Sequence, residues 1–354
     1  MTMRRMIRTM ELAAIGAALP LLRRLEPERA HTLGLVGLKC LRPIWPGAGP
    51  RRALALDCAG LRFEHPLGLA AGFDKNADYL DALGALGFSH VEIGTVTPRS
   101  QPGNPRPRMF RLSAERALVN RMGFNNKGAE YVAARLERRS YRGIVGISIG
   151  KNFDTPIERA GDDYLAVFRR LFSYADYFAV NVSSPNTARL RELQDRDALA
   201  RVVSPLVDAR TELVRRGARR VPIFVKIAPD LDAEAIDRLA DELPALAVDG
   251  VVATNTSNQL QRFGAALPPG TTGGLSGAPL HEKSLAAIAR LRSRLPRDFP
   301  IVGVGGIFDA RSALATLEAG ANLIQVYTGF AYRGPALVEE ILDALERRAT
   351  GGGE

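Results

Sequence analysis

The chain has 354 residues, 46% hydrophobic and 24% charged, so it can bury the core of one large α/β barrel with insertions. Its two cysteines, Cys40 and Cys58, fit neither a metal site nor a disulfide framework. The net charge of +10 is spread along the chain without a basic tract rich in aromatic residues. This argues against a nucleic acid partner and favours lipid or a small anionic ligand.

Residues 1–50 differ in composition from the rest and predict two short helices. Apolar residues recur at helical spacing from Met6 to Leu21 between flanking arginines, and a second segment begins at Pro27, a favoured first helical residue. The longest uncharged run covers about half of the roughly 20 residues that span a bilayer. We expect an amphipathic two-helix extension that lies on a membrane surface. A helical hairpin packed on the main domain, or a targeting peptide, is the alternative.

The Pro- and Gly-rich residues 43–50 are typical of a linker. They divide the chain into an N-terminal extension with its linker, residues 1–50, and a single catalytic domain, residues 51–354. Two short apolar runs, Leu54–Cys58 and Leu61–Phe63, surround Ala59-Gly60 and predict a hairpin that plugs the bottom of a barrel.

From residue 66 onward, short apolar runs rich in β-branched residues alternate with helical patterns. The predicted strands are Leu67–Ala71, His90–Thr95, Val145–Ile149, Tyr177–Val182, Ile223–Ile227, Gly250–Thr254, Ile301–Val304 and Leu323–Tyr327. The predicted helices are Asp78–Leu86, Lys127–Arg138, Pro156–Ser173, Asp197–Arg216, Ala233–Leu243, Pro279–Leu291, Ala310–Glu318 and Pro335–Arg348. Eight strands, each followed by a helix, predict an α/β fold of the (β/α)8 TIM barrel type. An open doubly wound sheet would normally carry a Gly-rich phosphate turn after its first strand, which is not found here.

Polar residues cluster where the predicted strands end. The fourth strand runs into Asn181–Asn186, two asparagines and two serines around a proline, which taken alone could be a capped loop. Parallel strands bring their carboxyl ends to one face of a barrel, so these residues are expected to share one site with Lys75 and Lys226. Two buried lysines need an anionic partner, and the glycines after strands seven and eight are where barrels bind phosphate. The set predicts a phosphorylated heterocyclic cofactor and a small polar substrate.

The insertion after the second strand contains Pro102, Pro105 and Pro107 and is expected to be a loop that covers the substrate. Each polar residue also has a simpler interpretation, because asparagines form turns and Lys226 could extend to solvent. The four histidines, His31, His65, His90 and His281, show no metal-ligand spacing and are interpreted as structural, so no metal is expected.

Eight motifs in series resolve these alternatives. In chain order they are Leu69-Ala70-Ala71-Gly72-Phe73-Asp74-Lys75, Glu92-Ile93-Gly94-Thr95-Val96-Thr97-Pro98, Asn120-Arg121-Met122-Gly123-Phe124-Asn125-Asn126, Asn181-Val182-Ser183-Ser184-Pro185-Asn186, Lys226-Ile227-Ala228-Pro229-Asp230, Ala253-Thr254-Asn255-Thr256, Gly273-Gly274-Leu275-Ser276-Gly277 and Gly303-Val304-Gly305-Gly306. Over essentially its whole length, the sequence resembles the membrane-associated, quinone-dependent class of dihydroorotate dehydrogenases.

The resemblance implies FMN in the barrel mouth and oxidation of (S)-dihydroorotate to orotate in de novo pyrimidine (UMP) biosynthesis. Electrons would leave through the N-terminal helices to a membrane quinone, ubiquinone or menaquinone. It also implies a peripheral location on the cytoplasmic face of a bacterial inner membrane, contact with the lipid surface and no obligate protein partner.

The same resemblance assigns residues. Ser184 stands where this class has its catalytic base, and Arg111 and Tyr327 match positions between the flavin and the quinone tunnel. The substrate contacts would be Lys75, Asn120, Arg121, Met122, Gly123, Phe124, Asn181, Asn186, Asn255 and Thr256. The flavin contacts would be Ala71, Gly72, Lys75, Thr95, Ser148, Asn181, Lys226, Thr254, Gly277, Gly306, Tyr327 and Thr328. Ser148 departs from the pattern, since an asparagine is expected there and a hydroxyl has a shorter reach than an amide.

Two other functions fit parts of the pattern. A soluble dihydroorotate or dihydropyrimidine dehydrogenase is also an FMN-dependent barrel enzyme, but it would favour a cysteine at position 184 or clusters of iron–sulfur cysteines. A non-catalytic membrane-bound barrel would bind a phosphorylated ligand and contain no flavin. The presence of Ser184, Lys75 and the asparagines together favours the quinone-linked enzyme.

Overall fold

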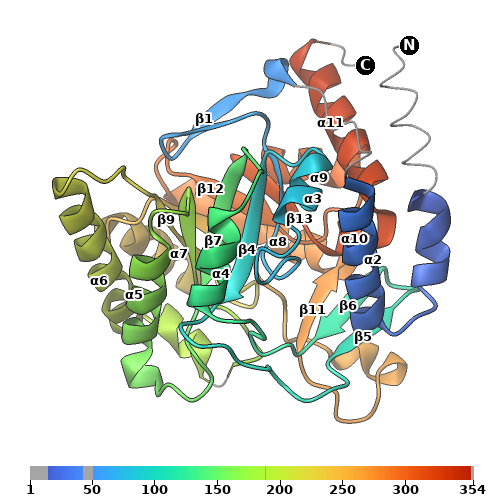
Figure 1. Ribbon diagram of the computed structural model, residues 1–354, viewed down its shortest axis with the longest axis horizontal. Coiled ribbons are helices and arrows are strands. Elements are labelled where there is room, and N and C mark those ends of the chain that lie inside the picture. The colour runs from blue at the N-terminus through green and yellow to red at the C-terminus, as the bar shows by residue number, and fades with distance from the viewer. Residues whose placement is uncertain (1–14, 43–50, 188, 352–354) are drawn as a thin grey trace.

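A closed barrel of eight parallel strands forms the centre of the computed structural model, which describes residues 15–42, 51–187 and 189–351 (Figure 1). Its strands run in chain order around the barrel: β3 (Leu67–Leu69), β4 (His90–Val96), β7 (Ile144–Ile149), β8 (Tyr177–Asn181), β9 (Ile223–Ile227), β10 (Gly250–Ala253), β12 (Ile301–Val304) and β13 (Leu323–Val326). Nearly every strand residue is buried, as expected of parallel strands covered on both faces. The predicted TIM barrel is confirmed.

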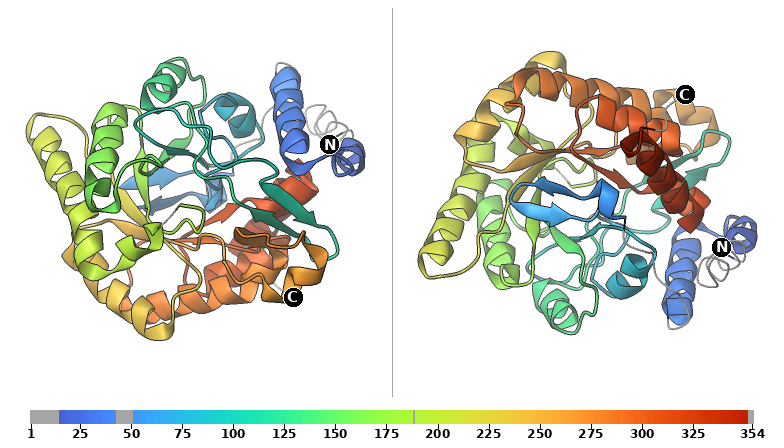
Figure 2. Two further views of the ribbon diagram at one scale, coloured as in Figure 1. Left: turned by 90° about the horizontal axis from the view of Figure 1, so that it is seen from below. Right: turned by 90° about the horizontal axis from the view of Figure 1, so that it is seen from above.

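Helices surround the barrel on its outside (Figure 2). They are α3 (Leu80–Ala85), α4 (Ala129–Glu137), α5 (Ala160–Leu171), α6 (Arg196–Arg215), α7 (Ala233–Ala245), α8 (His281–Arg294), α9 (Ala310–Glu318), α10 (Thr328–Arg333) and α11 (Pro335–Ala349). Each predicted helix is present; α9 has the predicted bounds, and the others are shifted at one or both ends. The short α10 was not predicted, because its six residues lie in a segment interpreted only as a phosphate-binding turn.

The predicted hairpin is formed by β1 (Leu56–Cys58) and β2 (Leu61–Phe63), which pair antiparallel. Cys58 and Phe63 are buried among side chains of the barrel interior, including Tyr177. In the right-hand view of Figure 2 the hairpin crosses one end of the barrel. It covers the amino-terminal end of the strands.

A second sheet lies beside the open end of the barrel. It contains β5 (Met109–Leu112), β6 (Ala117–Asn120) and β11 (Gly274–Gly277), paired antiparallel in the order β11-β6-β5. The prediction that the insertion after the second strand is only a loop was therefore wrong for β5 and β6. Each of these two strands has only four residues, so its apolar pattern is too short to recognise. The strand that pairs with β6, β11, lies far away in the sequence, and local sequence does not reveal that pairing.

The N-terminal extension packs against this end of the molecule (Figure 1). Helix α2 (Pro27–Leu41) begins at the predicted proline, where the Glu26 side chain accepts from the amides of Glu28 and Arg29. A second helix covers the described residues 15–22. The predicted first turns from Met6 onward and the predicted linker, residues 43–50, lie outside the described residues. In the described ranges, no helix has the length and apolarity needed to cross a membrane.

Candidate active site

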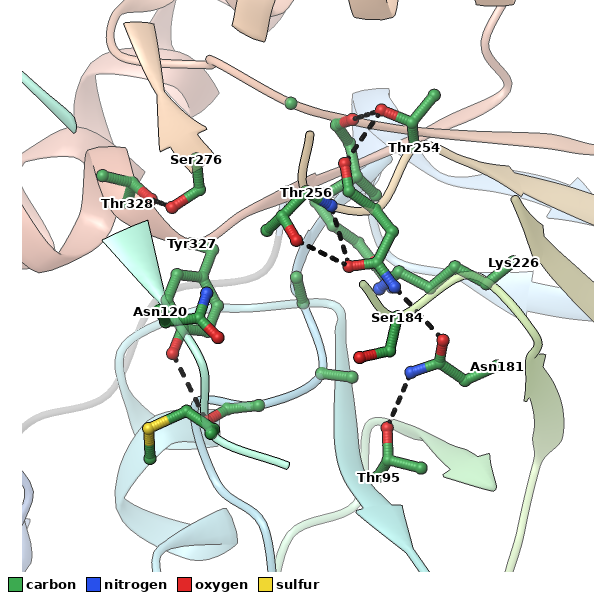
Figure 3. A pocket seen from close by; sticks show the side chains of 18 of the residues that line it. Thr95, Asn120, Asn181, Ser184, Lys226, Thr254, Thr256, Ser276, Tyr327 and Thr328 are labelled. Carbon is green, nitrogen blue, oxygen red and sulfur yellow. Dashed lines mark hydrogen bonds between the residues drawn. The ribbon is translucent and has the colours of Figure 1, made fainter. Parts of the chain in front are cut away.

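The polar residues expected at the strand ends surround one cavity at the carboxyl-terminal end of the barrel (Figure 3). The predicted residues that line it are Ala71, Gly72, Lys75, Thr95, Asn120, Met122, Gly123, Phe124, Asn181, Ser184, Asn186, Lys226, Thr254, Asn255, Thr256, Gly277, Gly306, Tyr327 and Thr328. They come from both the barrel and the small sheet, so the insertions complete the cavity wall.

Three predicted residues do not line this cavity: Arg121, Ser148 and Arg111. The Arg121 guanidinium donates to the Pro107 carbonyl at 2.9 and 3.1 Å. Successive residues of an extended chain point to opposite sides. Because its neighbour Asn120 faces the cavity, the Arg121 side chain points away from it. Ser148 is fully buried behind Thr95, with their hydroxyl oxygens 2.9 Å apart.

The other lining residues are not among the assigned contacts, although Gly305 and Gly329 belong to the glycines that were expected to bind phosphate. They are Ala70, Gly94, Asn125, Ser276, Leu280, Val304, Gly305, Ile307, Gln325 and Gly329. Most of them are next to a predicted residue in the sequence. Including one or two more residues at each predicted strand end would have found them. Gln325 has its own signal, because it is a polar residue within an apolar strand, as Lys226 is.

A line of hydrogen-bonded side chains crosses the cavity wall (Figure 3). The Asn181 amide donates to the Thr95 hydroxyl at 2.9 Å, and Asn181 Oδ1 accepts from Asn255 Nδ2 at 3.1 Å. Across the cavity rim, Asn186 Nδ2 donates to Asn120 Oδ1 at 3.2 Å. Asn186 Oδ1 is buried and has no partner in the part of the chain that the structure describes. It is an acceptor available to a ligand, since buried acceptors are seldom left unpaired.

Ser184 lies in the loop after β8, and its side chain faces the cavity. Its Oγ accepts a hydrogen bond from the Asn186 amide at 3.2 Å. A donor at this oxygen stabilises negative charge there, so the hydroxyl can more readily give up its own proton as it accepts another.

Lys75 is the last residue of the motif Leu69–Lys75 and lines the same cavity. Its ammonium donates to the Gly72 carbonyl at 2.8 Å. Among the described residues no carboxylate lies within ion-pair distance of it. Burial lowers the pKa of Lys75 to about 8, although the charge of Glu28 raises it in part. The cation therefore remains available for an anionic ligand at neutral pH.

A second charged group lies on the floor of the cavity. Lys226 Nζ is 3.6 Å from Oε1 of Glu92, whose side chain is fully buried. The other oxygen, Oε2, accepts from the Tyr177 hydroxyl and from Gln325 Nε2, both at 3.0 Å. Burial, followed by the Glu92 charge, raises the pKa of Tyr177 well above its usual value, so Tyr177 remains a donor.

The loops after β12 and β13 suit a phosphate. Gly305 and Gly306 line the cavity, and in the described chain neither amide donates to a protein acceptor. At Gly306, φ is +68° and an added Cβ would lie 2.6 Å from His281, so a larger residue would displace the turn. Backbone amides beside the start of α10 at Thr328 form the type of cradle that binds phosphate in barrels.

A second, mainly apolar cavity lies under the N-terminal extension. Tyr327 lines both cavities, and its ring centre is 5.4 Å from that of Phe73, which is 4.8 Å from His31. Arg111 lines the apolar cavity and donates to the carbonyls of Arg23 and Leu25 at 2.6 and 3.0 Å. His31 had been interpreted as structural, since nothing in the sequence indicates this wall. Burial lowers its pKa to about 3, so it is neutral here.

Comparison with known proteins agrees with this geometry. Residues 53–349 match the family model described as dihydroorotate dehydrogenase. Proteins named dihydroorotate dehydrogenase (quinone) from Aromatoleum aromaticum and Stenotrophomonas maltophilia are 48% and 50% identical, over 95% and 94% of this chain and 96% and 95% of theirs. Crystal structures of DHODH from Eimeria tenella superpose with TM-scores of 0.81 (ferulenol complex) and 0.82 (ligand-free). Both are 35% identical, covering 90% and 92% of this chain and 90% and 96% of theirs. The chain therefore belongs to the dihydroorotate dehydrogenase family.

Proposed function

We propose that this protein is a quinone-linked dihydroorotate dehydrogenase. It oxidises (S)-dihydroorotate to orotate with FMN and passes the electrons to a membrane quinone, in de novo pyrimidine biosynthesis. One observation carries the proposal: the cavity lined by Ser184 and Lys75 shares a wall residue, Tyr327, with the apolar cavity under the N-terminal extension. A polar substrate and an apolar acceptor can thus be bound on either side of one aromatic residue.

The residues of the polar cavity suit the removal of a proton. Dihydroorotate must lose a proton from the carbon next to a ring carbonyl and a hydride from the neighbouring carbon. Ser184 Oγ takes the proton, and the hydrogen bond from the Asn186 backbone amide stabilises the negative charge that develops there as Ser184 gives up its own proton. A serine hydroxyl must pass on its own proton as it does so, and Thr256, another lining residue, or Thr187 relays it. The Lys75 ammonium stabilises the developing enolate.

The asparagines of the cavity suit the substrate. Dihydroorotate has a carboxylate and two ring amides, so it presents donors and acceptors at fixed angles. Asn120, Asn181, Asn186 and Asn255 each offer one acceptor and two donors, and the unpaired Asn186 Oδ1 is assigned to a ring N–H. Met122 and Phe124 close the cavity from the insertion, and Arg121 supports that segment through Pro107.

The donor set fits FMN. When bound, FMN accepts the hydride and later releases the electrons to the quinone. Its phosphate would be held by the free amides at Gly306 and by the Thr328 region, and its ring by Lys226, Thr254 and Gly277. The Glu92 carboxylate beside Lys226 fixes the position of that cation. Ser148 lies behind Thr95, and we assign it a role in orienting Thr95.

We assign residues 1–50 to quinone access and membrane contact, and residues 51–354 to catalysis. Five of the seven exposed large apolar side chains in the described residues lie on the N-terminal helices or their turn: Leu21, Leu25, Leu33, Val36 and Leu41. This concentration supports peripheral attachment to a lipid surface, which we place on the cytoplasmic face of a bacterial inner membrane. Ubiquinone or menaquinone would enter the apolar cavity between these helices and the barrel, past Arg111 and His31.

An anaerobic titration tests the proposal. The purified protein is expected to be yellow, to bleach with dihydroorotate and to recover its colour with a quinone analogue, but not with fumarate or a nicotinamide. Recovery with fumarate or a nicotinamide would instead indicate a soluble-type enzyme. A yellow protein that does not bleach would have another substrate, and a colourless one would contradict the flavin assignment.

A further inference from the structure

Arg191 ties together three loops at the rim of the active site. It lies in a short 3-10 helix, η4 (Leu190–Gln194), that follows the Ser184 loop. Its Nε donates to the Ser183 carbonyl at 3.1 Å, its Nη2 to the Thr256 carbonyl at 2.8 Å, and its Nη1 to Asp230 Oδ2 at 2.9 Å. These partners follow β8, β10 and β9, so one guanidinium joins three neighbouring strand ends.

Asp230 keeps this guanidinium in place. Its carboxylate is 10% exposed and also accepts from Lys283, the Ser257 hydroxyl and the Asn258 amide. Burial alone would raise the pKa of Asp230, but these hydrogen bonds hold it below its usual value. The group is therefore charged at neutral pH, and its fixed oxygens orient the planar Arg191 fork toward the two carbonyls.

The two carbonyls belong to the catalytic wall. Ser183 directly precedes Ser184, and Thr256 lines the cavity itself; Figure 3 shows Ser184 and Thr256 facing the same space. Asn255 joins the same loops from the inside, since its Nδ2 donates to the Ser183 hydroxyl at 3.0 Å. Arg191 does not line the cavity. It acts on the loops from behind, without touching a ligand.

We propose that Arg191, oriented by Asp230, is a positioning residue that sets the place of Ser184 Oγ relative to the substrate carbon. This inference rests on the proposed function. Proton transfer requires donor and acceptor within hydrogen-bonding distance, and a displacement of about 1 Å caused by a remote substitution can lower a rate about 100-fold. Without the guanidinium, the Ser184 loop loses the donor that holds the Ser183 carbonyl, and keeps the hydrogen bonds of Asn255 to Ser183 and of Asn186 with Asn120 and Asn104. The fork geometry is essential, because Arg191 donates from three separate nitrogens, whereas the three N–H donors of a lysine leave from a single nitrogen.

The test compares Arg191→Gln and Arg191→Lys with the control Arg189→Gln. Arg189 lies in the same loop, but among the described residues its guanidinium pairs only with the exposed Glu158 and Glu192. The measurements are the rate constant of flavin reduction by saturating dihydroorotate under anaerobic conditions across pH, the dissociation constant of orotate, and the flavin content.

Both Arg191 variants are expected to keep their flavin and to reduce it about 100-fold more slowly, with a shifted pH profile. Orotate affinity should change much less than the rate. The control should change the rate less than about threefold, since exposed ion pairs contribute little. The inference is overturned if Arg191→Gln keeps the wild-type rate and pH profile, or if Arg191→Lys restores both.

If Arg191→Gln loses its flavin, Asp230→Asn is measured instead. This variant retains the arginine but weakens the contact that orients its guanidinium. Asp230→Asn is expected to slow flavin reduction by about tenfold, because a neutral amide holds the guanidinium less firmly than a charged carboxylate. An unchanged rate there would also overturn the inference. Wild-type protein that is not reduced by dihydroorotate would instead contradict the proposed function, so the two failures are distinguishable.

Discussion

Glu28 of α2 and Arg108, just before β5, form a nearly buried two-point ion pair. Arg108 Nη2 lies 2.7 Å from Oε1 and its Nε lies 3.1 Å from Oε2; the two side chains are 7% and 12% exposed. Arg108 Nη1 also donates to the carbonyls of Pro102 and Asn104. The N-terminal extension thus holds the start of the insertion that carries the proposed substrate contacts.

The Glu28–Arg108 pair predicts that Glu28→Gln affects substrate binding as well as stability. Loss of the charge should lower the free energy of unfolding by about 2 kcal/mol. This lies between the usual cost of breaking an exposed ion pair and that of breaking a buried one, because the pair is nearly buried. The Glu28 charge also raises the pKa of Lys75, so the variant should have a higher KM for dihydroorotate at neutral pH. Thermal unfolding and initial rates measure the two effects.

Arg106→Gln is the matched control for Glu28→Gln. Arg106 pairs with the same carboxylate at 2.9 Å, but its side chain is 72% exposed, so its loss should have little effect. Equal effects of the two substitutions would contradict the role assigned to the buried pair. A measurable effect of Glu28→Gln on KM would also mean that removing residues 1–40 impairs the dihydroorotate half-reaction, which sequence alone would not suggest.

Much of the fold could be predicted from the sequence because each barrel strand is a local, apolar, β-branched run. The small sheet could not, since the partner of β6 is β11, and no local pattern links Asn120 to Gly274. The residues at the strand ends could be predicted too, because each directly follows one of these local apolar runs in the sequence. His31 and Arg191 were not, because a lone histidine in a helix and an arginine in a charged loop carry no pattern. Their roles depend on which distant segments they meet.

Ser184→Ala is expected to retain flavin and bind orotate, but to reduce flavin about 100- to 10,000-fold more slowly at neutral pH, the usual contribution of general base catalysis. Stopped-flow absorbance with dihydroorotate measures the rate. Ser293→Ala is the control, since Ser293 is exposed on α8 and its hydroxyl donates to the Arg290 carbonyl, far from the cavity lining. Flavin reduction at a normal rate in Ser184→Ala would place the base elsewhere.

Orotate affinity is predicted to fall as the pH rises through about 8. Burial lowers the pKa of Lys75 to about 8, so the ammonium that pairs with the ligand carboxylate is present below that pH and lost above it. At pH well above 8 the apparent dissociation constant should rise by up to about tenfold per pH unit. Orotate titrations followed by the flavin spectrum between about pH 6 and 9.5 measure this. Lys75→Gln should bind weakly with no such dependence, and a flat wild-type profile would contradict the assignment.

The exposed face of α2 predicts how the protein attaches to membranes. Leu33 and Val36 are 53% and 43% exposed, and burying two such side chains in lipid contributes a few kcal/mol, at roughly 25 cal/mol per Å². The double variant Leu33→Ser, Val36→Ser should therefore bind anionic phospholipid vesicles at least about tenfold more weakly, while flavin reduction by dihydroorotate stays normal. Phe153→Ser is the control, because Phe153 is 68% exposed but lies in the loop after β7. If Phe153→Ser weakened vesicle binding as much as the double variant, the contact surface would lie on the barrel rim instead of α2.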